Sequence, residues 1–173
     1  IRSFWGFSRC PEYGVTMPET RQVLKVFLSS PGDLGPERDV IRDIVILLSN
    51  DPLVHQHFYL ILVGWDTPNA LVPLSATRTP QDSVNEYLGY PKDCDLTIVL
   101  IWSRLGTPLP KSLTRADGTQ YESGTVWEME DAKSAGKPVI IYRKKGVPQI
   151  SLTDPEIQTK LAQFNSVQKF AES

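Results

Sequence analysis

The chain has 173 residues, with 18 basic and 20 acidic side chains and a net charge of −2. This length suits a single globular domain with a sizeable core, and the charge argues against a protein that tracks a nucleic-acid backbone. Two cysteines, Cys10 and Cys94, are too few for a disulfide framework and do not match a zinc pattern with His55 and His57. No apolar run is long enough to span a membrane, and no secretory signal is found. We therefore expect a cytoplasmic protein that binds neither membranes nor nucleic acid directly.

Residues 1–16 show no apolar period and are interpreted as an N-terminal extension, of natural or vector origin. Residues 17–173 are predicted to form a single domain in which strands and helices alternate. Short β-branched and apolar runs predict strands at 23–28, 58–63, 96–101 and 138–142. Helices are predicted from Pro36 to Leu48, at 81–88, at 125–135 with Gly136 at the C-terminal cap, and from Asp154 to Phe170.

This alternation predicts an α/β domain with a doubly wound parallel sheet and helices on both faces. Such sheets bind ligands in the crevice beyond the carboxyl ends of the strands. The loops to examine for a site are therefore 29–35, 65–80 and 103–123, which follow the first three predicted strands.

The first of these loops contains two hydroxyls, Ser29 and Ser30, and the carboxylate of Asp33, just before a helix. Backbone N–H groups and the helix dipole favour a phosphate group at such a position. Alternatively, Ser30 or Asp33 merely caps the helix and needs no ligand. The Walker signature and the three-glycine dinucleotide fingerprint are both absent, so the loop taken alone favours the capping interpretation.

The helix after the third loop carries three acids, Glu128, Glu130 and Asp131. Thr125 and Glu128 have the spacing of a capping box, in which Glu128 would only satisfy backbone N–H groups. Alternatively, a carboxylate in the first helical turn points into the crevice and receives ribose hydroxyls or faces a developing oxocarbenium ion. Carboxylates serve this purpose in glycosidic cleavage because the transition state is cationic. Of the three acids, Glu128 is nearest the loop.

Other candidates follow the second and third predicted strands, at the same edge of the sheet. They are Trp65, Asp66, Trp102, Arg104 and Gly106. An aromatic ring there can stack on a base, and an arginine can pair with a phosphate or carboxylate group. Alternatively, the tryptophans pack at the rim and Arg104 forms a solvated ion pair. We group these residues with the polar residues of the first loop as nucleotide-binding candidates, and we predict no metal site.

Three stretches together resemble a known group of domains. They are KVFLSSPGDLGPER at 25–38, CDLTIVLIWSRLGTP at 94–108, and SGTVWEMEDA at 123–132 with GKPV at 136–139. They resemble the TIR-like domains that precede STAND-type NTPase modules or repeats in bacterial multidomain proteins, and that are relatives of TIR domains and nucleoside 2-deoxyribosyltransferases. The resemblance implies a flavodoxin-like fold and, in the active members, cleavage of an N-glycosidic bond.

For TIR domains the substrate is NAD⁺, and the resemblance assigns the essential glutamate to Glu128 through the stretch from Gly124 to Glu128. Ser29 and Ser30 match the loop that lines the nucleotide pocket, whereas Arg104 and Gly106 match only loosely. The tryptophan-cysteine-x-x-glutamate pattern of standard TIR domains is missing, which leaves Glu130 as a second candidate. The resemblance also implies that the domain is the N-terminal part of a larger protein.

Two functions follow as expectations. The first is an NAD⁺ glycohydrolase, an N-glycosidase of the EC 3.2.2 type, which acts in a bacterial anti-phage receptor when clustering brings copies together. NAD⁺ is then a substrate, and no cofactor is expected. The second is a non-catalytic module for homotypic contacts or nucleotide sensing, in which Glu128 is only a capping residue.

Overall fold

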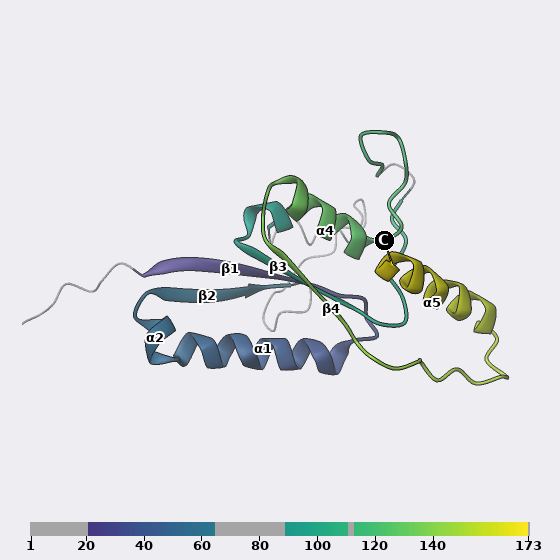
Figure 1. Cartoon of the computed structure of the whole chain (residues 1–173), viewed down its shortest axis with the longest axis horizontal. Helices are drawn as coiled ribbons and strands as arrows, with labels where there is room; N and C mark the ends of the chain where they lie inside the picture. The colour runs from purple at the N-terminus through teal and green to yellow at the C-terminus, as the bar shows by residue number, and fades with distance from the viewer. Residues whose placement is uncertain (1–20, 65–88, 111–112, 173) are drawn as a thin grey trace, which may run out of the picture.

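The computed structural model describes residues 21–64, 89–110 and 113–172. Its central feature is a parallel sheet of four strands in the order β2-β1-β3-β4. The elements in chain order are β1 (Gln22–Ser29), α1 (Gly35–Asn50), α2 (Pro52–His55), β2 (Phe58–Val63), η1 (Pro91–Asp93), β3 (Leu96–Ile101), α4 (Gly124–Ser134), β4 (Val139–Arg143) and α5 (Ile157–Glu172). Figure 1 shows α1 and α4 on opposite sides of this sheet. The doubly wound α/β fold with flavodoxin-like architecture, predicted from the sequence, is therefore confirmed.

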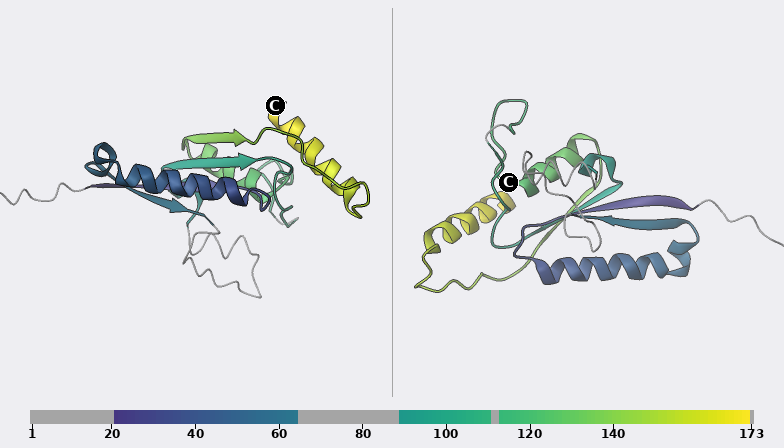
Figure 2. Two further views of the ribbon diagram at one scale, coloured as in Figure 1. Left: turned by 90° about the horizontal axis from the view of Figure 1, so that it is seen from below. Right: turned by 180° about the vertical axis from the view of Figure 1, so that it is seen from behind.

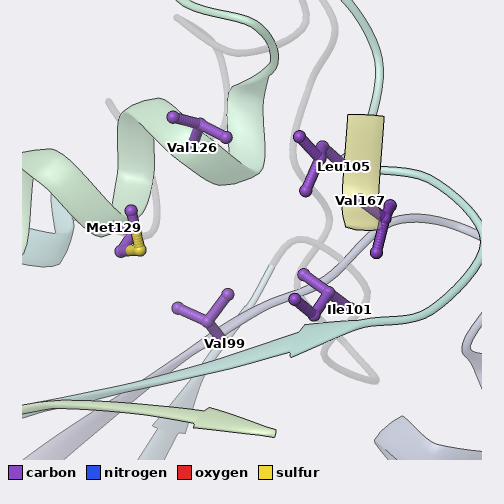
Figure 3. Packing of buried hydrophobic residues seen from close by; sticks show 6 residues of the cluster. All are labelled: Val99, Ile101, Leu105, Val126, Met129 and Val167. Atoms are coloured by element: carbon purple, nitrogen blue, oxygen red, sulfur yellow. The ribbon is translucent and has the colours of Figure 1, made fainter. Parts of the chain in front are cut away.

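Alternation along the strands divides the side chains between the two helical layers. On the α4 side, Val99 and Ile101 of β3 pack with the buried residues Leu105, Val126, Met129 and Val167 (Figure 3). On the α1 side, Leu28 and Leu100 pack with buried Leu34. Uniformly apolar β3 thus contributes to both cores, as expected for a strand covered on both faces.

The last helix, α5, lies beyond the carboxyl ends of the strands (Figures 1 and 2). It is anchored to the α4-side core by Val167, which is fully buried, and by the partly buried Phe170. Leu161, earlier in the same apolar seam, remains 42% exposed. The predicted seam therefore packs mainly through its C-terminal part.

Most predicted boundaries agree with the structure to within a residue or two. The strands predicted at 58–63 and 96–101 match β2 and β3, and Gly136, with φ of 69°, follows α4 as expected for a C-terminal glycine. The prediction that Ser29 lies in a loop is wrong, because it is the last residue of β1. The final helix begins at Ile157 rather than near Asp154.

Several predictions lie outside the described residues. These are the extension at 1–16, the long loop at 65–80 with Trp65 and Asp66, and the helix at 81–88. The short elements α2 and η1 were not predicted. None of the helices in the described part of the chain combines the length and the apolar character that a membrane span requires.

Candidate functional site

The loops after β1 and β3 meet at the point where the chain reverses its direction of winding. Strand β1 is followed in sequence by β2 on one side and has β3 on the other. In open α/β sheets, this switch point is where ligands bind beyond the carboxyl ends. Here Asp33 accepts hydrogen bonds from the backbone N–H and the hydroxyl of Ser103, with distances of 3.3 and 2.5 Å to Oδ2. Arg104 Nε lies 3.4 Å from the other oxygen of the same carboxylate.

Glu128 turns toward the end of β1 from the α4 side. The Ser29 hydroxyl donates a hydrogen bond of 2.5 Å to Glu128 Oε2. Both residues are buried, Ser29 fully and Glu128 with 7% of its surface exposed. The carboxylate predicted to be catalytic is therefore held at the carboxyl edge of a central strand.

The capping box predicted from Thr125 and Glu128 is wrong. The N-cap of α4 is Ser123, whose hydroxyl accepts a hydrogen bond from the backbone N–H of Val126. The Glu128 carboxylate instead reaches across to β1. The cap is thus provided by a residue that lies before the predicted box, and the capping explanation of Glu128 no longer holds.

Ser30 faces the opposite layer from Ser29. Its hydroxyl accepts a hydrogen bond of 3.3 Å from Arg38 Nη1, which also donates to the carbonyl of Pro31 at 3.0 Å. Arg38 is buried on α1. The two adjacent hydroxyls, one in the last residue of β1 and one directly after it, therefore bind different helices, one on each side of the sheet.

Neither Ser30 nor Asp33 caps α1. The N-cap is Leu34, without a side-chain hydrogen bond to the helix, and Pro36 stands in the first turn. The capping interpretation of the first loop is therefore wrong, because Ser30 binds Arg38 and Asp33 binds Ser103.

Gly106 allows the loop after β3 to approach the start of α4. Its φ is 116°, in a region that L side chains rarely adopt. A Cβ atom here would lie 2.9 Å from Thr125 Oγ1. Next to this contact, the Ser123 hydroxyl donates to the carbonyl of Leu105 at 2.5 Å. Gly106 therefore positions the helix that carries Glu128.

Trp102 lies on the α1 side of the sheet, away from Glu128. It packs against the Leu28 cluster, its Nε1 donates to the carbonyl of Gly146, and the Lys144 ammonium lies 4.1 Å from its ring centre. Lys144 also pairs with Glu37 at 2.6 Å. The hydrogen bond from Lys144 lowers the pKa of the Glu37 carboxyl below its ordinary value.

Glu130, the second catalytic candidate, is engaged in a different contact. Arg115 donates to both of its oxygens, through Nε at 2.9 Å and Nη2 at 2.6 Å. The same guanidinium donates to Glu122 and to the carbonyl of Gln120, and it lies over the Tyr121 ring. The hydrogen bonds that Arg115 donates to the carboxylates of Glu130 and Glu122 raise its pKa. Glu130 thus ties the loop before α4 to that helix.

The described residues contain no group of three or more potential metal ligands. His55 Nδ1 lies 3.0 Å from the carbonyl oxygen of Ser49, which accepts the hydrogen bond, and the His57 ring lies against Phe58. Cys94 is buried, and desolvation raises the pKa of its thiol to about 11. None of these side chains joins the polar groups at the carboxyl edge.

Sequence reasoning missed three residues that organise this edge: Arg38, Ser103 and Arg115. Arg38 ends the stretch at 25–38 that carries the resemblance, whereas Arg115 lies outside the three stretches. The partners of both residues become evident only in three dimensions. Ser103 could have been suspected, because it opens the predicted loop 103–123 at the ligand-binding edge. Its partner Asp33 is 70 positions away, so the pairing depends on strand order.

Comparison with known proteins identifies the family. Residues 25–172 match the family described as "Domain of unknown function (DUF4062)". The chain belongs to this family. The matched region begins within β1 and ends with α5, so it includes all the candidate residues described above. No curated protein and no solved structure matches the chain significantly.

Proposed function

We propose that this DUF4062 domain is a TIR-like NAD⁺ glycohydrolase that cleaves the bond between nicotinamide and ribose. The observation that carries the proposal is the contact between Ser29 Oγ and Glu128 Oε2 at 2.5 Å. A carboxylate used only for capping would bond its own helix, whereas this one is held at the ligand-binding edge of the sheet.

In the proposed reaction, the carbon–nitrogen bond to nicotinamide breaks and its electrons return to the pyridine ring. Nicotinamide leaves as a neutral molecule, so little acid catalysis is required. Water then adds to the ribose cation and loses a proton, giving ADP-ribose. An internal nucleophile in place of water would give a cyclic product. Glu128 binds the ribose diol and stabilises positive charge on the ring as it develops.

The chain's other groups have supporting roles in this proposal. Ser29 orients the Glu128 carboxylate, and Gly106 sets the approach of the loop to α4. Polar groups at the switch point, including Arg104, bind the phosphates. Glu128 has only 7% of its surface exposed, and we propose that clustering of copies opens it to substrate.

The test is release of nicotinamide from NAD⁺ at high protein concentration or on a clustering scaffold. Glu128→Gln is expected to abolish release, because the amide cannot supply negative charge to the transition state. Glu130→Gln is the matched variant on the same helix, and it separates the two glutamates. Glu156→Gln, with an exposed carboxylate, controls for general effects of lost charge.

Two results would contradict this proposal in different ways. Turnover that survives Glu128→Gln but not Glu130→Gln would move the catalytic role to Glu130. Absence of turnover in the clustered wild-type domain would favour the alternative, a non-catalytic module.

A specific observation favours that alternative as a second candidate. Strand β4 stands at one edge of the described sheet, and it exposes Ile140, Ile141 and Tyr142 to the extent of 42%, 42% and 52%. Edge strands with exposed apolar side chains are suited to pairing with another chain. With a homotypic contact through β4, the apparent mass of the domain would rise with protein concentration. Sedimentation should show this rise for wild type and a smaller one for Ile141→Lys.

A further inference from the structure

The switch point between β1 and β3 holds a set of hydrogen-bond donors directed at one carboxylate. Ser103 contributes its backbone N–H and its hydroxyl, and Arg104 contributes its guanidinium. All three approach Asp33, which belongs to the other loop. A carboxylate that accepts from a backbone N–H, a hydroxyl and an arginine occupies the kind of environment in which proteins bind phosphate oxygens.

The neighbouring backbone is shaped to let the arginine lie close. A Cβ atom at Gly32 would come within 3.1 Å of Arg104 Nη2, so the absence of a side chain makes room for the guanidinium. The side chains of Arg104 and Asp33 retain 35% and 18% of their exposure. The donors are therefore within reach of a solute, and the ion pair is only partly withdrawn from water.

The Asp33–Arg104 pair is weak enough to be exchanged. Its closest distance is 3.4 Å, and partly exposed ion pairs contribute little to stability. A phosphate group carries more charge and more acceptor oxygens than a carboxylate, so it competes well for the same donors. Dissociation of Asp33 would leave the position vacant, and Asp33 itself belongs to none of the hydrophobic clusters.

We propose that Ser103 and Arg104 form a binding site for a phosphate group, and that the Asp33 carboxylate occupies this site in the free protein. The ligand class is a nucleotide or dinucleotide pyrophosphate, seated at the switch point. Asp33 then acts as an internal competitor that a ligand displaces. Only the identification of the ligand as NAD⁺ rests on the proposed function.

Inorganic pyrophosphate is the probe, titrated calorimetrically into the full chain at low ionic strength, where charge contacts are least screened. Asp33→Asn removes the competing charge with little change in shape, and it is expected to bind about tenfold more tightly than wild type. Arg104→Gln is expected to bind about tenfold more weakly. Arg143→Gln, at the end of β4, is the matched control and should bind as wild type does.

The proposal is overturned if Asp33→Asn binds pyrophosphate no more tightly than wild type. Asp33 would then serve only to join the two loops through its hydrogen bonds. The same conclusion follows if no protein binds pyrophosphate at all, or if Arg143→Gln weakens binding as much as Arg104→Gln. Melting temperatures of the variants show whether each is folded.

A second measurement does not depend on any variant. In wild type, pyrophosphate should shift the amide resonance of Ser103 and the Nε resonance of Arg104, and unmoved signals at both would also contradict the site. These outcomes are separate from those for nicotinamide release. Tighter pyrophosphate binding by Asp33→Asn, together with no nicotinamide release by the clustered wild-type domain, would support the phosphate site and reject the enzyme.

Discussion

The hydroxyl of Ser29 and the carboxylate of Glu128 lie 2.5 Å apart, although 99 positions separate them in the chain. This bond joins the end of β1 to the second layer of the domain. Hydrogen bonds to charged groups are stronger than those between neutral groups, and both partners here are buried. The pair therefore contributes to the stability of the fold as well as to the proposed chemistry.

Ser29→Ala removes the donor and is expected to destabilise the domain by about 2 kcal/mol, because the buried carboxylate loses a charge-assisted hydrogen bond. Chemical denaturation measures the change. Ser134→Ala is the control, since the Ser134 hydroxyl bonds an exposed carbonyl of its own helix. Its effect should stay within about 0.5 kcal/mol. Equal effects of the two substitutions would show that the Glu128 contact has no special energetic weight.

Gly106→Ala is expected to cost about 3 kcal/mol, because it combines an unfavourable positive φ with a Cβ atom 2.9 Å from Thr125 Oγ1. Gly118→Ala has the same backbone problem, with φ of 84°, but meets no atom within 4 Å. It should cost about 1 kcal/mol. Thermal unfolding of both variants tests the difference, and similar losses would mean that Thr125 moves aside freely.

The contact between Glu37 and Lys144 gives a pH dependence with a definite sign. The pKa of Glu37 is lowered from its ordinary value of 4.5, mainly by the hydrogen bond from Lys144. A carboxyl group with a depressed pKa in the folded state stabilises that state above its unfolded pKa, and the effect is lost as pH falls through the folded pKa. Wild type should therefore exceed Glu37→Gln in stability at neutral pH and equal it in strong acid.

Urea midpoints of wild type and Glu37→Gln at the two pH values measure this dependence. Glu172→Gln, which changes an exposed carboxylate near the end of α5, provides the comparison. If the difference between wild type and Glu37→Gln did not shrink on acidification, the Lys144 contact would not be its source.

Val167→Ala tests how α5 is attached. The Val167 side chain is fully buried against β3 and α4, so its truncation leaves a cavity and is expected to cost about 2 kcal/mol. Leu161→Ala, at a position that is 42% exposed, should cost less than about 1 kcal/mol. Limited proteolysis should release α5 more readily from the first variant. Equal susceptibility would indicate that Phe170 alone holds the helix.

The four described strands and the long helices α1, α4 and α5 could be predicted from the sequence because their signals are local. Runs such as 58–63 and 96–101 are bounded by clear breakers, and they correspond directly to β2 and β3. The capping predictions failed for the opposite reason. Ser30, Asp33 and Glu128 are all polar residues near helix starts, which suits a cap. Asp33 and Glu128 instead bond to residues far away in the sequence, and Ser30 bonds to the Arg38 side chain of α1.

The distant partners of Asp33 and Glu128 depend on the order of the strands and on which helix covers which face, and the alternation of strands and helices determines neither. Asp33 meets Ser103 only because β1 and β3 are neighbours in the sheet. Similarly, the role of Ser29 depends on its being the last residue of β1, so that its side chain is directed by the strand. A loop residue with the same identity would have had no such constraint.

Ser29 and Ser30 are consecutive, yet one bonds α4 and the other bonds α1. The end of β1 is therefore hydrogen-bonded to both helical layers. A displacement there cannot be confined to one side, because rotating the backbone moves both hydroxyls at once. A solute that moves this end of the strand would therefore change the hydrogen bonds of two buried side chains together, Arg38 in one layer and Glu128 in the other.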